Sequence, residues 1–209
     1  MTEFWRGPAL AKMMRAIHSY SSMLVLVLLL FFAITGITLN HPDLIISKAG
    51  QVSQQSELEL PPYLQLAELP KSAAKQAEIA AQFRNWLSQE HQIKASVFSY
   101  SFEVDDMLLE LDFKRPAGYA SVVVDFSAGK AELDMEFGGY LALLNDLHKG
   151  RNAGISWVLL IDLTAIACIV FALTGFYLIL KQPSRRSLGN SLAMLGIFVT
   201  LFAYILSLH

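Results

Sequence analysis

Residues 22–40 read SMLVLVLLLFFAITGITLN and contain no charged side chain. An α-helix rises about 1.5 Å per residue, so a run of this length matches the hydrocarbon core of a bilayer. The run predicts a membrane span at 22–40, preceded by a cytoplasmic helix over residues 1–21. The alternative is a cleaved signal peptide, but its apolar core would be shorter, and Thr-Leu-Asn-His-Pro offers no small-residue cleavage site.

Two further apolar runs predict a second and a third span. Residues 154–180 carry Asp162 as their only charge, residues 188–208 carry none, and a short cytoplasmic turn at 181–187 joins them. The chain is 54% apolar and only 16% charged, which excludes an ordinary soluble globule. Its net charge of −2, without a basic stripe, argues against a nucleic-acid partner. The single cysteine, Cys168, excludes an intrachain disulfide.

Basic residues in short flanks of membrane spans favour the cytoplasmic side. Both the amino-terminal flank and the 181–187 turn are basic, through Arg6, Lys12, Arg15, Lys181, Arg185 and Arg186. We therefore expect a bacterial inner-membrane protein surrounded by lipid, with its N-terminus inside and residues 41–153 in the periplasm. That external segment holds 16 of the 18 acids and 10 of the 16 basic residues, a net charge of −6.

Residues 45–150 predict a small α+β unit within this external segment. Apolar positions at three- and four-residue spacing predict a helix that Ser72 caps and that ends near Glu90. Alternating apolar and polar residues then predict four strands of an antiparallel sheet, at 95–103, 107–113, 119–126 and 130–137. Asp105-Asp106 is typical of a hairpin turn, with a role in attracting ferric ion as the alternative. His91 is interpreted as a solvated histidine, and the unit contains no pattern typical of a catalytic nucleophile or phosphate loop.

Four of the five histidines lie at the predicted span boundaries, namely His18, His41, His148 and His209. A lone histidine at an interface is typical of an amphipathic side chain that reaches toward water. However, His41 and His148 approach the same outer leaflet from two helices. Neutral imidazoles on facing helices are one way in which a membrane bundle holds a b-type haem. His209 is interpreted as part of an ordinary tail, although ligation from the outer side is geometrically feasible.

Three residues inside the spans add to this pattern. Gly36 and Gly175 each follow a threonine, and a missing side chain lets a helix or a porphyrin face approach closely. Ordinary packing of helices through small residues is the alternative. Asp162 is the only charge within a span and is therefore a functional candidate, which could orient an imidazole, pair with a basic group or relay a proton. A structural hydrogen bond to a neighbouring helix is equally consistent with its position.

Several short motifs resemble those of the PepSY-associated transmembrane proteins. In the first span, Arg15-Ala16-Ile17-His18 resembles the family's R-x-x-H start, and Ile34-Thr35-Gly36 resembles its T-G exit. Around the second span the similar segments are Leu147–Arg151, Gly154, Asp162-Leu163 and Leu173-Thr174-Gly175. Val122–Asp125 and Ser127–Lys130 are similar to the last hairpin of a PepSY domain. The resemblance covers nearly the whole chain and implies a PepSY-like domain on three spans.

The resemblance also implies an activity and a cofactor. Family members include ferric-siderophore reductases that carry b haems between transmembrane helices, and the three-span form resembles the VciB-type ferric reductases. It implies haem b with His18, His41 and His148 as candidate axial ligands of the iron. Five residues are further candidates near the cofactor: Arg15, Gly36, Arg151, Gly175 and, as an outer support, Asp162.

The implied partners follow from the same resemblance. Ferric iron or a ferric chelate would be the substrate, and the electron donor would be a cytoplasmic partner or a quinol, since no flavin or nicotinamide fingerprint is present. The inner side offers only His18, so a homodimer could pair two copies of it across a twofold axis. The alternative function is a haem-free accessory protein whose PepSY-like domain regulates a peptidase or a transporter.

Overall fold

The computed structural model describes residues 7–41 and 50–208 of the chain. Contacts within the chain divide it into two compact units. We call residues 1–31 with 161–209 the membrane unit, and residues 32–160 the sheet unit. The sheet unit includes the end of the first long helix and the start of the second. Each unit is described by itself below.

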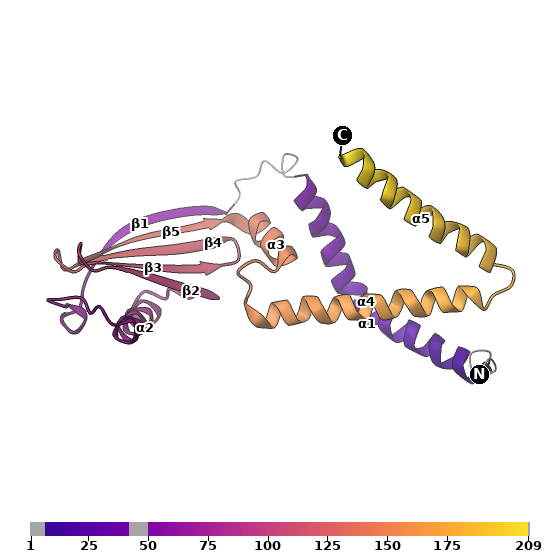
Figure 1. The fold of residues 1–209 in the computed structure, drawn as a ribbon, viewed down its shortest axis with the longest axis horizontal. Coiled ribbons are helices and arrows are strands. Elements are labelled where there is room, and N and C mark those ends of the chain that lie inside the picture. The colour runs from indigo at the N-terminus through magenta and orange to yellow at the C-terminus, as the bar shows by residue number, and fades with distance from the viewer. Residues whose placement is uncertain (1–6, 42–49, 209) are drawn as a thin grey trace. The chain divides into compact units, whose positions relative to one another are not determined.

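Three helices have the length and hydropathy needed to cross a membrane. They are α1 (Pro8–Asn40), α4 (Gly154–Leu180) and α5 (Arg186–Ser207) (Figure 1). The prediction of three membrane helices is therefore confirmed. The predicted cytoplasmic helix and first span form one continuous helix, because proline occurs in α1 only at its first position, where helices tolerate it.

The membrane unit packs through small and hydroxyl-bearing side chains. Its buried residues include Ser21, Thr164, Ala167 and Thr174, the kinds of residue that let membrane helices approach closely. Helix α5 has no buried residue, but its first turn approaches α4 closely, because a Cβ at Gly189 would overlap the side chain of Ile179. Most apolar side chains of these helices are therefore available to lipid.

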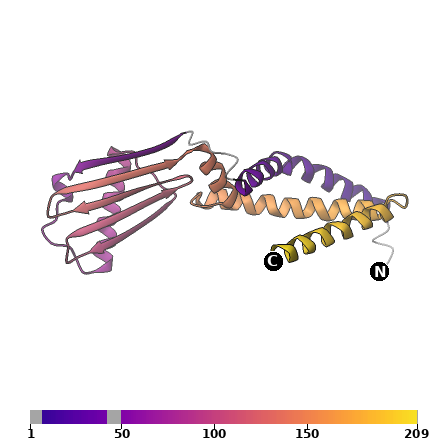
Figure 2. The same cartoon turned by 90° about the horizontal axis from the view of Figure 1, so that it is seen from above.

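The sheet unit contains a five-stranded antiparallel sheet with one long helix on one face (Figure 2). The strand order is β1-β5-β4-β3-β2. The strands are β1 (Gln51–Glu59), β2 (Val97–Glu103), β3 (Leu108–Arg115), β4 (Gly118–Asp125) and β5 (Lys130–Gly138). The helix is α2 (Ala73–Glu90), and a 3₁₀ turn, Pro62–Leu64, precedes it. This arrangement confirms the predicted fold class.

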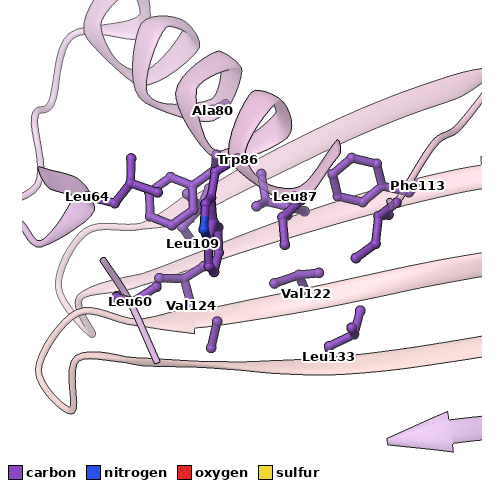
Figure 3. Close-up of a cluster of buried hydrophobic side chains, with 14 of the residues drawn as sticks. Leu60, Leu64, Ala80, Trp86, Leu87, Leu109, Phe113, Val122, Val124 and Leu133 are labelled. Carbon is purple, nitrogen blue, oxygen red and sulfur yellow. The ribbon is translucent and has the colours of Figure 1, made fainter. Parts of the chain in front are cut away.

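The core of the sheet unit lies between α2 and the sheet (Figure 3). Alternate residues of the central strands point toward the helix, so that Leu109, Leu111 and Val122 are fully buried. From the helix, Phe83 and Leu87 are equally buried against them. Burying each such side chain contributes about 1.5–3 kcal/mol. The opposite face of the sheet carries no helix among the described residues of the sheet unit.

Two elements were not predicted. The sheet has five strands rather than four, because β1 pairs with β5 over nine residues, from Gln51 opposite Gly138 to Glu59 opposite Lys130. Its sequence, QVSQQSELE, hardly alternates, since an edge strand that is largely exposed needs few apolar residues. The second is α3 (Gly139–Lys149), which ends at Gly150 in the left-handed conformation, with φ of 67°. His148 therefore lies in a separate helix before the second span.

The local turn predictions are confirmed, with one difference. Residues 104–107 form the β2–β3 turn around Asp105-Asp106, and Gly129 has a positive φ of 68° in the β4–β5 turn. Ser72 precedes α2 as predicted, but its side chain makes no capping hydrogen bond. The residue instead accepts a bond from the backbone N–H of Gln76 through its carbonyl oxygen.

Candidate functional site

His18 contacts α4 within the membrane unit. Its Nδ1 lies 3.1 Å from the carbonyl oxygen of Phe171 and 3.2 Å from Oγ1 of Thr174. The imidazole also stacks on the Phe171 ring, with centroids 4.6 Å apart and planes inclined by 11°. A Cβ at Gly175 would lie only 2.9 Å from Cε1 of His18. Glycine at this position therefore makes room for the imidazole.

These contacts determine which nitrogen of His18 carries the proton. A carbonyl oxygen can only accept, so Nδ1 donates to Phe171 and is protonated. The Thr174 hydroxyl lies 2.7 Å from the Val170 carbonyl oxygen and donates to it, which leaves its own lone pairs to face Nδ1. In the neutral ring, Nε2 then keeps its lone pair. Nε2 has no hydrogen-bond partner among the described residues. A neutral histidine that is protonated on Nδ1 can bind a metal through Nε2.

His148 occupies an equivalent site in the sheet unit. Its Nδ1 lies 2.8 Å from Oγ1 of Thr35, and the same Oγ1 lies 3.4 Å from the Phe32 carbonyl oxygen. The Phe32 ring meets the imidazole edge-on, with centroids 5.5 Å apart. A Cβ at Gly36 would lie 3.3 Å from Cε1 of His148. No carbonyl oxygen of the described residues contacts this Nδ1, so the hydrogen bond with the Thr35 hydroxyl fits either neutral tautomer of His148.

The two sites are built on a short internal repeat. Residues 32–36 read FAITG and residues 171–175 read FALTG. Positions one, four and five of such a segment share one face of a helix. In both copies the phenylalanine contacts the imidazole, the threonine hydroxyl lies within hydrogen-bond distance of Nδ1, and the glycine leaves room for the ring. The two Thr-Gly pairs are apparent from the sequence, whereas the role of the phenylalanines and the assignment of one histidine to each copy are not.

Helix α3 is fixed on several sides close to His148. The indole Nε1 of Trp157 donates to the Leu147 carbonyl oxygen at 2.8 Å. The Thr38 hydroxyl approaches Oδ1 of Asn145 at 3.4 Å. The backbone N–H of Ala117, in the β3–β4 turn, donates to the Asp146 carboxylate at 2.8 Å. Contacts with α1, α4 and the sheet therefore hold the helix that presents His148.

The other predicted residues lie outside these two contacts. His41 follows α1 and is exposed, and within residues 7–41 and 50–208 it has no hydrogen bond or ring contact. Arg15 and Asp162 are exposed on their helices, and neither has a hydrogen bond or ion pair in the described part of the chain. His91 meets the Trp86 ring with centroids 4.9 Å apart. His209 lies outside the described residues.

The structure therefore pairs His18 with Gly175 and His148 with Gly36, and no contact between His41 and His148 occurs among the described residues. It also shows an imidazole, rather than a second backbone, against each glycine. Among the described residues there is no group of three or more histidine, cysteine or acidic side chains that could hold a metal ion. Each site thus offers a single imidazole nitrogen to a ligand.

The fold is that of a membrane protein with three candidate spans and an α+β domain between the first two of them. Each of its two histidine sites joins a residue that precedes this sheet in the sequence to one that follows it. The chain belongs to the putative PepSY_TM-like family, whose model matches residues 9–209. The predicted family is thereby confirmed. No curated protein and no solved structure matches the chain.

Proposed function

We propose that this protein is a b-haem ferric reductase of a bacterial inner membrane, which passes electrons to Fe(III) or a ferric chelate at the periplasmic face. The observation that carries the proposal is the duplicated Phe-Thr-Gly arrangement, each copy with its own histidine. His18 lies in the first half of α1, whereas Thr35 lies near the end of the same helix. Two like sites toward opposite ends of a membrane helix are what a transmembrane electron route requires.

The residues at both sites fit an axial ligand of haem iron. A hydrogen bond from Nδ1 to an oxygen orients the ring and makes Nε2 a better donor to a metal. Both threonines, Thr35 and Thr174, are buried. A bound haem would supply one-electron redox chemistry between the two faces. His18, His148 and their glycines and threonines would hold and orient it.

A second copy of the chain would complete a bis-histidine site. Each described site presents one imidazole, so a twofold dimer could set His18 of one chain opposite the same residue of its mate. His41 remains a candidate second ligand for the outer site. The donor on the cytoplasmic side is a quinol or a partner protein in this proposal. Each electron delivered converts one Fe(III) to Fe(II), which oxygen ligands hold less tightly.

The activity is testable in sealed proteoliposomes that contain a membrane-impermeant reductant, with ferric citrate and a ferrous-specific chelator outside. We expect ferrous iron to appear outside at a rate that depends on the protein. His18→Ala and His148→Ala should each abolish the signal, while His91→Ala should leave it unchanged. An equal rate in all four samples would contradict the proposal.

The haem-free accessory role is the second candidate, and the sheet supports it. Strands β1 and β2 are both edges, and one sheet face is uncovered by any described helix of the sheet unit. An exposed edge can accept an added strand from a partner protein. This role would be favoured if the wild-type protein captures one partner, if Gln54→Pro in β1 abolishes that capture, and if His148→Ala retains it.

A further inference from the structure

A cleft of about 430 Å³ opens at one end of the sheet, between the β3–β4 turn, the end of β5, helix α3 and the residues that follow it. It lies wholly within the sheet unit. Three cationic side chains and two carboxylates line it, namely Lys114, Arg115, Arg151, Glu136 and Asp146. The cleft therefore carries a positive charge within a segment, 41–153, whose net charge is −6.

Neither carboxylate forms an ion pair with Lys114 or Arg115 among the described residues. Asp146 accepts from the backbone N–H of Ala117 at 2.8 Å and lies 4.0 Å from Nε of Arg151. Glu136 faces the Tyr119 hydroxyl and contributes to raising its pKa. Lys114 and Arg115 are exposed, and neither has an ion pair within the described residues. An anion in the cleft would therefore meet two cationic groups, Lys114 and Arg115, that no carboxylate among the described residues pairs with.

The cleft borders the first turn of a membrane span. Asn152, which lines it, lies two residues before the start of α4 at Gly154. Ser96 joins the sheet to the same turn, because its N–H donates to the Lys114 carbonyl at 3.0 Å and its Cβ lies 3.7 Å from the Cβ position of Gly154. Trp157 follows within this turn, and tryptophan is enriched at the level of the lipid headgroups.

We propose that this cleft binds the phosphate of an anionic phospholipid headgroup. Guanidinium groups bind phosphate through paired hydrogen bonds, and a lysine adds a point charge. A soluble oxyanion such as inorganic phosphate or citrate shares this chemistry. The lipid is the better match because Asn152 of the cleft lies two residues before α4, a helix long and apolar enough to cross a membrane. The inference goes beyond the proposed reductase activity and does not depend on haem.

The test uses the full chain in nanodiscs of phosphatidylcholine alone or of equal parts phosphatidylcholine and phosphatidylglycerol, with native mass spectrometry to count retained phosphatidylglycerol. We expect Arg115→Gln to weaken phosphatidylglycerol binding about fivefold, as removal of one interfacial charge does, and Lys114→Gln to act similarly. Arg115→Lys should retain most of the binding. Lys75→Gln removes the same charge from exposed α2 and serves as the matched control with no expected effect.

A second arm adds inorganic phosphate or citrate to the protein in phosphatidylcholine nanodiscs. Phosphatidylglycerol retention that falls in Arg115→Gln but not in Lys75→Gln supports the proposal. Equal retention in both variants overturns it. Tight binding of phosphate or citrate together with no preference for phosphatidylglycerol also overturns it, because the occupant would then be a soluble anion. Circular dichroism of each variant confirms that the comparison concerns folded protein.

Discussion

Three glycines of the spans differ in what an added methyl group would meet. At Gly175 the methyl carbon would lie 2.9 Å from the His18 ring, and at Gly36 it would lie 3.3 Å from the His148 ring. At Gly196 nothing lies within 4 Å. The first distance is shorter than real contacts allow, whereas the second requires only a small shift of the imidazole. The glycines therefore offer a graded test of how tightly each histidine is held.

We expect Gly196→Ala to raise the unfolding temperature or leave it unchanged, because alanine favours a helix by about 1 kcal/mol over glycine. Gly175→Ala should lower it, since the methyl group displaces His18, and Gly36→Ala should fall between the two. Thermal unfolding of the full chain in detergent measures the order. A Gly175→Ala protein as stable as Gly196→Ala would show that His18 does not pack against this position.

Outside the membrane spans, the pKa of Tyr119 is raised above its usual value of 10.0. The charge of Asp134 is the main cause of its raised pKa, followed by burial and by Glu136. The Tyr119 hydroxyl donates to the Asp134 carboxylate at 3.3 Å. A raised pKa means that the folded state holds this proton more tightly. The resulting stability is present below pH 10.0 and is lost as pH rises through the raised value.

Asp134→Asn should therefore lower the pKa of Tyr119 toward 10.0, because the amide keeps the shape of the side chain but removes its charge. Ultraviolet titration of tyrosinate, with Tyr119→Phe identifying the relevant transition, measures the shift. The control is Asp125→Asn, at another position of β4, which should leave the transition where it is. An unchanged midpoint in Asp134→Asn would assign the raised pKa to burial and Glu136 instead.

Among the elements, those with strong periodicity could be predicted from the sequence and those without it could not. Helix α2 and strands β2–β5 follow their apolar spacing, which is why their positions were close to those observed. Strand β1 is polar because it is an edge strand. Helix α3 is short and lies just before a span, so the apolar pattern of α3 merges with the apolar run of α4. The pairing of each histidine with one glycine could not be predicted either, since a contact between distant helices leaves no spacing rule in either one.

The packing of α2 on the sheet is the main source of stability in the sheet unit. Leu87 has no exposed surface and faces the central strands. We expect Leu87→Ala to destabilise the sheet unit by about 2–5 kcal/mol, as buried leucine truncations do. Lys75→Ala, exposed on the same helix, should change stability by less than about 0.5 kcal/mol. Urea unfolding followed by tryptophan fluorescence measures both, and equal midpoints would contradict the observed packing.

At the scale of the whole molecule, composition and three apolar runs were enough to predict the membrane architecture. The family match over residues 9–209 agrees with it. Orientation rests on the basic flanks alone, since charge in short flanks directs insertion whereas a long domain crosses regardless of its charge. Ser127 in the β4–β5 turn and Ser184 in the α4–α5 turn are both exposed and would lie on opposite faces of the membrane.

We expect a membrane-impermeant maleimide to label Ser127→Cys in intact spheroplasts and to label Ser184→Cys only after the membrane is opened. Both variants carry Cys168→Ser, which removes the one native thiol. The Cys168→Ser protein without an added cysteine is the control and should remain unlabelled. Labelling with the reverse pattern would place the sheet unit in the cytoplasm and would exclude reduction of iron at the outer face.

The central claim is that His18 and His148 each present a nitrogen to haem iron. The most direct measurement is the absorption spectrum of the purified protein, oxidised and then reduced with dithionite, after expression with ample haem. The account predicts a sharp low-spin b-type difference spectrum that is reduced by His18→Ala and separately by His148→Ala, but not by His91→Ala. A colourless wild-type protein, or a spectrum indifferent to both substitutions, would contradict it.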